Sequence, residues 1–247
     1  MSEATKIHWL DSGEPFSEQF QDFYFSTDGG LQETEYVFLK QNGFPERFAE
    51  FQSQTLRIGE TGFGTGLNFL VTCYHYLKTH THCQAILHYT CVEKYPLSKH
   101  QLITAYQTFA DKWPQLVPYC QELLAQYPDD FSAINKPILL SLFNHKIQLY
   151  FIKADANLGL QALFKHQPLQ QRPAIDAWYL DGFSPAKNPD MWHQDLFNSL
   201  ASLSKTGTTI STFTSAGHVR RGLIEAGFTM SKVSGLGKKR EILRGII

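Results

Sequence analysis

A glycine-rich segment with an acidic residue before it carries the clearest chemical signal in this sequence. Residues 56–70 read LRIGETGFGTGLNFL, so Glu60 is followed by Gly62, Gly64 and Gly66, each separated by one residue. Glycines let a backbone turn sharply and approach a ligand without a clash from a Cβ atom. A helix that begins behind such a turn offers free N–H groups and a partial positive charge. The segment therefore predicts a turn that binds a ligand.

The pattern around this turn predicts the elements that position it. A short apolar run precedes Glu60, and apolar residues recur at three- and four-residue steps from Leu67 to Leu77. Strand, glycine-rich turn and helix, in this order, begin a nucleotide-binding α/β unit. The dinucleotide motif G-x-G-x-x-G would need glycine at the position of Leu67, which disfavours an NAD-dependent oxidoreductase. The observed E-x-G-x-G-x-G resembles the first motif of class I S-adenosylmethionine (SAM) methyltransferases.

Three further acidic residues follow predicted strands. Glu93 ends the second apolar run, Asp155 follows the third and Asp181 follows the fourth. In α/β sheets, ligands bind at the edge formed by the carboxyl ends of the strands. Glu93 is placed to accept hydrogen bonds from ribose hydroxyls. Asp181 begins a loop that Gly182 and two prolines make rigid, at the same edge.

The rest of the chain alternates predicted strands with predicted helices, which is typical of a mostly parallel sheet. We expect seven strands, at residues 55–60, 85–93, 147–154, 175–180, 207–213, 228–233 and 241–247. The last two should form an antiparallel pair at one edge. Helices are expected at residues 66–79, 158–166, 194–202 and 218–226. Residues 1–50 are predicted to be an N-terminal extension packed on the core, whose acidic and aromatic side chains line one wall of a pocket. Residues 51–247 are predicted to be the main domain, with a helical insertion at about 95–146.

Composition limits the class of protein. The chain has 247 residues, of which 43% are hydrophobic and 18% are charged, so it can fill the core of one large α/β domain. No apolar run approaches the roughly 18–20 residues that span a bilayer, and no secretory signal is visible. The four scattered cysteines are interpreted as reduced thiols, which indicates a cytoplasmic protein.

Charge is unevenly distributed along the chain. The net charge of −1 gives no global signal for nucleic-acid binding. Residues 1–35 carry a net charge of −7, whereas residues 218–247 carry +5. The basic C-terminal segment could bind phosphates locally, or it could be an ordinary solvated surface.

Four segments together resemble a narrower family. GETGFGTGLNFL, YLDGFSPAKNPDMW, TFTSAGHVRRGL and GLGKKREIL are similar to the MnmC-type tRNA 5-methylaminomethyl-2-thiouridine methyltransferases, and the resemblance runs from about residue 8 to the last residue. In many bacteria this methyltransferase is the N-terminal half of a bifunctional protein, and elsewhere it stands alone; the sequence fits both forms. The resemblance implies a class I SAM-dependent methyltransferase fold, which is Rossmann-like. It also implies methyl transfer from SAM to the exocyclic amine of 5-aminomethyl-2-thiouridine, the wobble uridine of certain tRNAs, to give 5-methylaminomethyl-2-thiouridine.

The resemblance also implies roles for individual residues. Asp181 is expected to be catalytic, beside the methyl group in transfer, where it would hold the amine and receive its proton. Contacts to SAM are expected from Tyr24, Glu60, Gly62, Phe63, Gly64, Gly66, Asn68, Glu93 and Asp155, with Glu60 near the ammonium end of SAM and Asp155 near its adenine amino group. Contacts to tRNA are expected from Phe183, Lys187, Lys238, Lys239 and Arg240. Further candidates for stacking on the base are Phe25, Tyr36 and Trp192.

SAM is the cofactor expected for this chain, with no metal and no FAD. His80, His82 and Cys83 could form a metal cluster, but no second set of ligands follows at zinc-finger spacing. The expected partners are the anticodon loop of tRNA and an FAD-dependent oxidoreductase half, fused or separate, that supplies the amine. No membrane partner is expected.

Two other functions stay open at this stage. One is a SAM-dependent N-methyltransferase that acts on a small amine, and the other is a non-catalytic module that binds nucleotide or RNA. A hydrolase is disfavoured, because neither Ser184 nor Ser215 lies in a G-x-S-x-G elbow.

Overall fold

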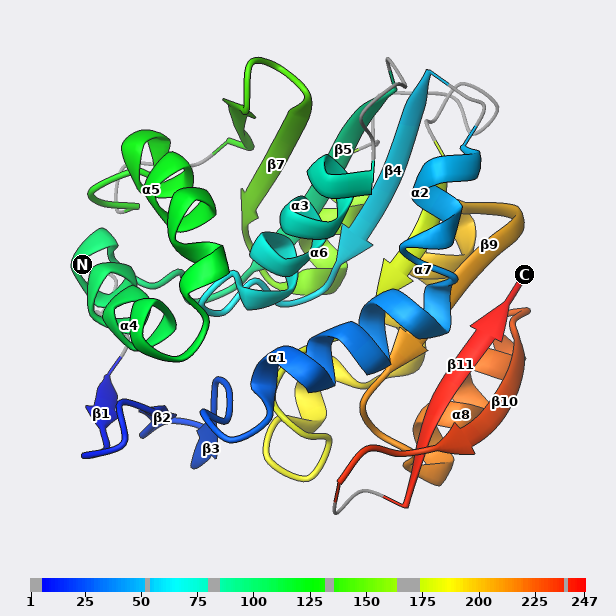
Figure 1. The fold of residues 1–247 in the computed structure, drawn as a ribbon. Helices are drawn as coiled ribbons and strands as arrows, with labels where there is room; N and C mark the ends of the chain where they lie inside the picture. Colours follow the sequence, from blue (N-terminus) through cyan, green and yellow to red (C-terminus); the bar gives the residue numbers. More distant parts are fainter. Residues whose placement is uncertain (1–5, 52–53, 80–84, 132–135, 164–173, 238–239) are drawn as a thin grey trace.

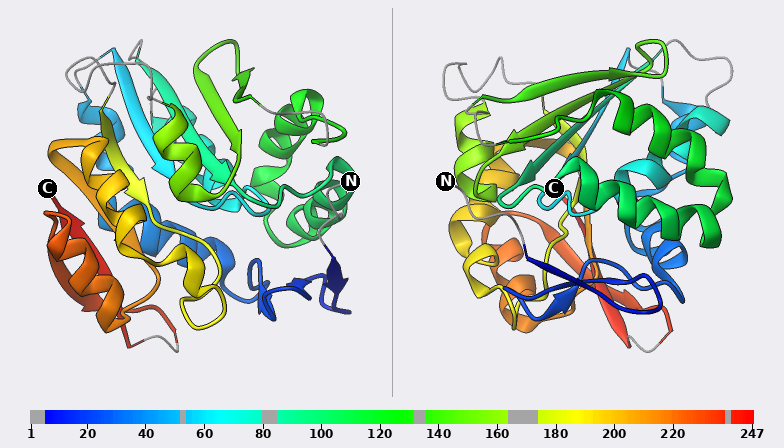
Figure 2. Two further views of the ribbon diagram at one scale, coloured as in Figure 1. Left: turned by 180° about the vertical axis from the view of Figure 1, so that it is seen from behind. Right: turned by 90° about the vertical axis from the view of Figure 1, so that its left-hand side faces the viewer.

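One large sheet with helices on both faces dominates the computed structural model (Figures 1 and 2). The structure describes residues 6–51, 54–79, 85–131, 136–163, 174–237 and 240–247. Over these residues the sheet has eight strands in the order β10-β11-β9-β8-β4-β5-β7-β6. The strands are β4 (Thr55–Glu60), β5 (Ile86–Glu93), β6 (Ile138–Leu142), β7 (Ile147–Lys153), β8 (Ile175–Tyr179), β9 (Ser204–Thr212), β10 (Thr229–Ser234) and β11 (Glu241–Ile246).

The strand order reverses at β4. This strand pairs in parallel with β5 on one side and with β8 on the other. Strand β7 continues the parallel sheet beyond β5, and β9 continues it beyond β8. The crevice outside the carboxyl ends of β4 and β8 is therefore the topological switch point, where sheets of this type bind their ligands.

Helices cover the sheet in two layers, which Figure 2 shows from behind and from the side. One layer contains α2 (Glu46–Glu50), α3 (Leu67–Thr79), α4 (Lys99–Lys112), η3 (Pro114–Leu116) and α5 (Val117–Gln126). The opposite layer contains α6 (Ala156–Leu163), α7 (Gln194–Ser202) and α8 (Gly217–Glu225). None of the described helices is long and apolar enough to cross a membrane.

The predicted strands and helices of the main sheet are confirmed, with one strand of this sheet missed. The strand at 55–60 and the helix at 194–202 have the predicted bounds, and the C-terminal pair is antiparallel as expected. The helix predicted at 158–166 is α6, and residues 164–166 lie outside the described residues. The prediction that the insertion stays helical to residue 146 is wrong, because β6 pairs antiparallel with β7 and makes the sheet eight-stranded rather than seven-stranded. The turn of this hairpin places Phe143, Asn144 and His145 at positive φ without a glycine, so the sequence lacks the usual mark of a hairpin.

The N-terminal residues form a small antiparallel sheet followed by short helices. The sheet consists of β1 (Ile7–Trp9), β2 (Pro15–Ser17) and β3 (Asp22–Phe23), which lie beyond the carboxyl ends of the main strands (Figure 1). The helices are α1 (Gly30–Glu33), the π-helix η1 (Thr34–Leu39) and the 3₁₀ helix η2 (Lys40–Asn42). The segment EYVFL, for which the sequence did not decide between a strand and a helix, lies in η1. A π-helix is rare and is frequently found at functional sites.

Candidate active site

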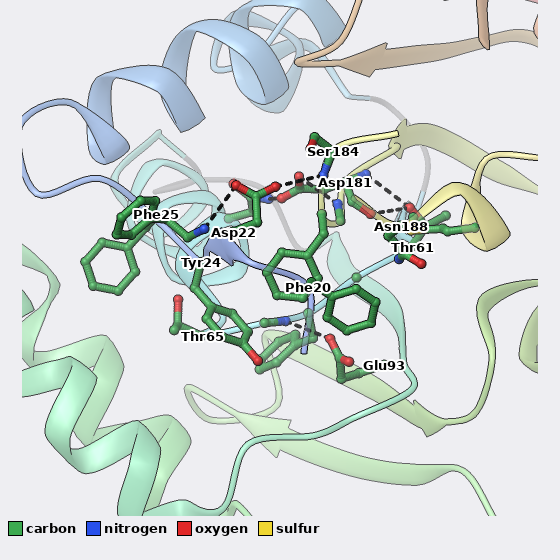
Figure 3. Close-up of a pocket in the computed structure, with 18 of the residues that line it drawn as sticks. Phe20, Asp22, Tyr24, Phe25, Thr61, Thr65, Glu93, Asp181, Ser184 and Asn188 are labelled. Carbon is green, nitrogen blue, oxygen red and sulfur yellow. Dashed lines mark hydrogen bonds between the residues drawn. The ribbon is translucent and has the colours of Figure 1, made fainter. Parts of the chain in front are cut away.

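A pocket of about 480 Å³ lies at the carboxyl ends of the central strands (Figure 3). It is lined by residues 19, 20 and 22–25 of the N-terminal segment, the glycine turn after β4, residues 93–95 after β5, Asp155 after β7 and the loop that begins at Asp181 after β8. The lining therefore confirms that the N-terminal segment forms one wall. Its size is typical of small-molecule and cofactor sites.

The lining of this pocket is strongly acidic. Among its described residues only Lys94 is Lys or Arg. Its acidic residues are Asp22, Glu33, Glu93, Asp155, Asp181 and Asp190. A cleft lined by one sign of charge concentrates ligands of the opposite sign. The pocket is therefore suited to a ligand with cationic groups.

The glycine turn closes tightly at the base of the pocket. Gly64 and Gly66 have φ values of 52° and 76°, the left-handed region that glycine adopts without strain. A Cβ atom on Gly62 would lie 3.0 Å from the backbone oxygen of Asp181, so glycine is needed there for close approach. The N–H of Gly64 donates to Glu93 Oε2 at 3.0 Å. Phe63 contributes to the lining, but its ring is buried against Phe151.

Glu93 and Asp155 lie in the pocket as predicted. Glu93 Oε1 also accepts the N–H of Tyr95 at 2.8 Å. Burial raises the pKa of Glu93, and the N–H donors of Gly64 and Tyr95 oppose that rise. Asp155 accepts the N–H of Asn157 at 3.2 Å and pairs with Lys94 at 3.4 Å.

The carboxylate of Asp181 is held by several hydrogen bonds. Its Oδ1 accepts the N–H of Gly182 at 2.8 Å, and its Oδ2 accepts a hydrogen of Asn68 Nδ2 at 2.6 Å. Its backbone N–H donates to Thr61 Oγ1 at 3.1 Å, and Thr61 Oγ1 donates to its carbonyl at 2.8 Å. These contacts fix Asp181 against the glycine turn, with its side chain at the pocket.

Glu60 lies beneath the pocket instead of in its wall. The residue is fully buried and is not part of the described lining, so the contact of Glu60 with the ligand stays a prediction. Its two carboxyl oxygens accept from Asn68 Nδ2 at 2.8 Å and from the Tyr89 hydroxyl at 3.0 Å. Asn68, which does reach the lining, thus connects Glu60 to Asp181.

The buried carboxyl of Glu60 predicts a specific pH dependence of stability. Burial, and next the charge of Asp181, raise the pKa of Glu60 well above its ordinary value. Between the ordinary and the raised pKa, the folded protein binds a proton that the unfolded chain has released, so the free energy of unfolding falls as pH rises. We expect Glu60→Gln to remove this decrease, so that the stability of the variant relative to the wild type increases as the pH rises above the ordinary pKa of a glutamate.

Urea unfolding across this pH range measures the effect. The exposed Glu18 provides a matched control, since Glu18→Gln should follow the wild-type curve. Parallel curves for Glu60→Gln and wild type would contradict the assignment of a raised pKa to Glu60.

Aromatic side chains of the N-terminal segment and of the loop after β8 form another part of the lining. The ring of Phe20 stacks on Phe183 with centroids 4.5 Å apart, and Tyr24 meets the edge of Phe183 at 5.0 Å. Burial, and next the charge of Glu93, raise the pKa of Tyr24, which keeps its phenol neutral. Asp22 Oδ2 accepts the N–H of Ser184 at 3.1 Å and so ties this wall to the loop after Asp181.

Comparison with known proteins identifies the class of enzyme. A family profile described as "S-adenosyl-L-methionine-dependent methyltransferase" matches residues 114–247. The chain belongs to this methyltransferase family. The methyltransferase also matches a crystal structure of MNMC2 from Aquifex aeolicus, with a TM-score of 0.74 at 18% identity, over 99% of this chain and 71% of that one. The likeness confirms the class I methyltransferase fold.

Curated relatives of the methyltransferase match almost all of its length. It is 46% identical over 246 residues to the "tRNA 5-methylaminomethyl-2-thiouridine biosynthesis bifunctional protein MnmC" of Aeromonas salmonicida (strain A449), which covers 97% of this chain and 35% of that protein. The protein of the same name from Aliivibrio fischeri is 44% identical over 245 residues, 98% of this chain and 34% of that protein. The methyltransferase thus spans about a third of the length of these relatives.

The residues predicted to contact tRNA differ in whether they line the pocket. Phe183 lines the pocket, whereas Lys187 and Arg240 are exposed outside its lining, and Lys238 and Lys239 lie outside the described residues. Trp192 is only 3% exposed and donates from Nε1 to the Phe183 carbonyl at 2.9 Å, so it supports the loop. Phe25 is likewise buried, and the hydroxyl of Tyr36 donates to the Ser234 carbonyl. The metal cluster considered at residues 80–83 also lies outside the described residues.

The sequence analysis did not name Phe20, Asp22 or Thr34 individually as residues of the site. They line the pocket, but they belong to short N-terminal elements without a repeating pattern. Only the general abundance of aromatic and acidic residues in that segment signalled their location.

Proposed function

We propose that this methyltransferase modifies the wobble uridine of tRNA, by transferring a methyl group from SAM to the exocyclic amine of 5-aminomethyl-2-thiouridine to give 5-methylaminomethyl-2-thiouridine. The observation that carries the proposal is the 46% identity over 97% of the chain to a protein named for the biosynthesis of this nucleoside. An acidic pocket with aromatic walls supports it, because the substrate combines an amine with a planar base.

The residues of the pocket fit SAM. Glycine at position 62 leaves room that a Cβ atom would fill, and the acidic lining suits both the sulfonium and the ammonium group. We assign the backbone of residues 62–66 to the methionine part of SAM, Glu93 to the ribose hydroxyls and Asp155 to the adenine amine. Tyr24 and Asn68 complete this proposed set.

Asp181 is the proposed catalytic residue. SAM supplies an electrophilic methyl group when bound. The amine of the substrate is mostly protonated near neutral pH, so its lone pair must be released and aimed. The carboxylate of Asp181, held by Asn68 and Gly182, can accept hydrogen bonds from this amine and receive its proton. Orientation of the amine by a fixed carboxylate contributes a further part of the rate.

Aromatic rings are the proposed contacts of the nucleobase. A wobble base lies in a single-stranded loop, where it can be turned out and stacked on aromatic side chains. Phe183 belongs to the loop that begins at Asp181, and its ring stacks on Phe20 in the wall of the pocket. Residues 1–50 would then be an extension that completes the site of the methyltransferase domain, residues 51–247.

The basic segment after β10 is the proposed binding site for the phosphates of the anticodon loop. We expect neutralisation of Lys238, Lys239 and Arg240 to weaken tRNA binding and to lower the slope of log K against log salt, by roughly 0.7–0.9 for each phosphate that these side chains neutralise in the wild type. Titration of tRNA at several salt concentrations measures both effects. Replacement of the exposed Lys112 and Lys146 by glutamine is the matched control. An unchanged salt slope in the triple variant would exclude these residues as phosphate ligands.

An FAD-dependent oxidoreductase is the proposed functional partner, fused or separate. The curated relatives are called bifunctional and are about three times as long as this chain. The proposed substrate is a primary amine, so a preceding reaction must expose it on the base. Because the substrate would be tRNA, we expect the protein in the cytoplasm.

Incubation of the protein with SAM and tRNA from cells that lack the modification tests the function. Mass analysis of the digested nucleosides should show a gain of one methyl group on 5-aminomethyl-2-thiouridine. Methylation of small amines without any methylation of tRNA would favour the small-amine alternative. Binding of tRNA without transfer in either assay would favour a non-catalytic module.

A further inference from the structure

The amide of Asn68 lies between two carboxyl groups and a hydroxyl. Its nitrogen donates to Glu60 Oε1 at 2.8 Å and to Asp181 Oδ2 at 2.6 Å. Its oxygen accepts from Thr34 Oγ1 at 2.8 Å. Because an amide nitrogen carries two hydrogens, both are used, one for each carboxyl group.

The direction of this amide matters for Asp181. If the amide were reversed, its oxygen would face the two carboxyl groups, and neither carboxyl group could accept a hydrogen bond from it. The two carboxyl groups, which accept from Asn68, therefore set the direction of the amide. The hydroxyl of Thr34, which can donate or accept, donates to the amide oxygen that faces it and so holds the amide in the orientation in which Asn68 supports Asp181.

The position of Thr34 suits such a role. Thr34 is 3% exposed and is the first residue of the π-helix η1, which packs against α3, the helix that carries Asn68. Glu60 is fully buried on the other side of the amide, where Tyr89 holds its second oxygen. The amide is thus held by Thr34 of the N-terminal segment on one side and by Glu60 at the end of β4 on the other.

We propose that Thr34 is a positioning residue for Asp181, which acts by holding the Asn68 amide between Glu60 and Asp181. The inference rests on the proposed role of Asp181. It makes the N-terminal segment part of the catalytic machinery as well as a wall of the pocket. A purely structural role would predict that Thr34 contributes to stability and leaves the orientation of Asn68 and the catalytic rate unchanged.

Two substitutions at this position separate these roles. Thr34→Val keeps the shape of the side chain but removes the donor, and Thr34→Ser keeps the donor. We expect Thr34→Val to lower kcat about ten-fold with a smaller change in the Kd for SAM, of which Asn68 is a proposed contact, and Thr34→Ser to retain at least half of the wild-type kcat. The matched control is Thr27→Val, which removes another buried threonine hydroxyl of the N-terminal segment, bonded to Glu14 and not to Asn68. Its kcat should match the wild type.

A second measurement does not depend on the substrate. The side-chain amide signals of Asn68 in a ¹⁵N–¹H NMR spectrum can be assigned by their disappearance in Asn68→Ser. In wild type and Thr34→Ser, these signals should be shifted from those of an exposed asparagine and protected from exchange, whereas in Thr34→Val they should not. Unaltered amide signals in Thr34→Val would overturn the inference, and so would a wild-type kcat in that variant. If wild-type protein does not methylate tRNA, the proposed function fails, and the NMR comparison alone then decides whether Thr34 orients Asn68.

Discussion

Replacement of Asp181 by asparagine is expected to lower kcat for tRNA methylation by at least about a hundred-fold, the lower end of what general acid–base catalysis contributes. The asparagine side chain has nearly the same shape but no charge and one acceptor oxygen fewer. It would lose the ability to receive a proton from the substrate amine. It would also leave Asn68 or Gly182, which both donate to the carboxylate, without an oxygen acceptor.

Binding of SAM should be much less affected than turnover in this variant. Apart from Asn68, the proposed SAM contacts lie on Tyr24, the glycine turn, Glu93 and Asp155. Asp181 hydrogen-bonds to the turn segment through its backbone and Thr61, and the substitution retains these bonds. Calorimetric titration with SAM and single-turnover methylation of tRNA measure the two quantities separately. Asp111→Asn, on the exposed side of α4, is the matched control for removal of a carboxylate. A single-turnover rate equal to that of wild type would exclude Asp181 as the group that accepts the proton.

Four of the predicted residues that line the pocket follow strands. Gly62, Glu93, Asp155 and Asp181 each come at or just after the carboxyl end of a predicted strand, and the topology of a parallel sheet brings these ends together. Their proximity could be predicted, because it depends on strand order and not on the packing of particular side chains.

The contacts that sequence reasoning could not locate join segments that are distant in the chain. Thr34 reaches Asn68 across 34 positions, and Asp22 reaches Ser184 across 162 positions. Both come from short N-terminal elements whose placement depends on tertiary packing. The burial of Glu60 is a similar case, since the motif places an acid before the glycines but does not indicate on which side of the strand its carboxyl group lies.

The backbone contact between Gly62 and Asp181 predicts the second large effect. A Cβ atom at position 62 would lie 3.0 Å from the Asp181 oxygen and 3.3 Å from Gly182 Cα. Both neighbours are backbone atoms, so no side-chain rotation can relieve the contact. Hydrogen bonds of 2.8 Å and 3.1 Å between Thr61 and Asp181 also resist separation of the two segments. Gly62→Ala must therefore displace the glycine turn or the loop that carries Asp181, the proposed catalytic residue.

We expect Gly62→Ala to weaken SAM binding and to lower kcat together, by a combined factor of roughly 10 to 100 in kcat/KM, since overpacking typically costs about 1–3 kcal/mol. Gly29→Ala is the matched control, because a Cβ atom there meets nothing within 4 Å. Thermal unfolding establishes that both variants are folded. Thr61→Val removes the hydroxyl bonds to Asp181 without a new contact, so it should lower kcat with a smaller change in SAM affinity. Unchanged SAM affinity and kcat in Gly62→Ala would show that the close approach of the turn and the loop does not couple the proposed cofactor site to Asp181, the proposed catalytic residue.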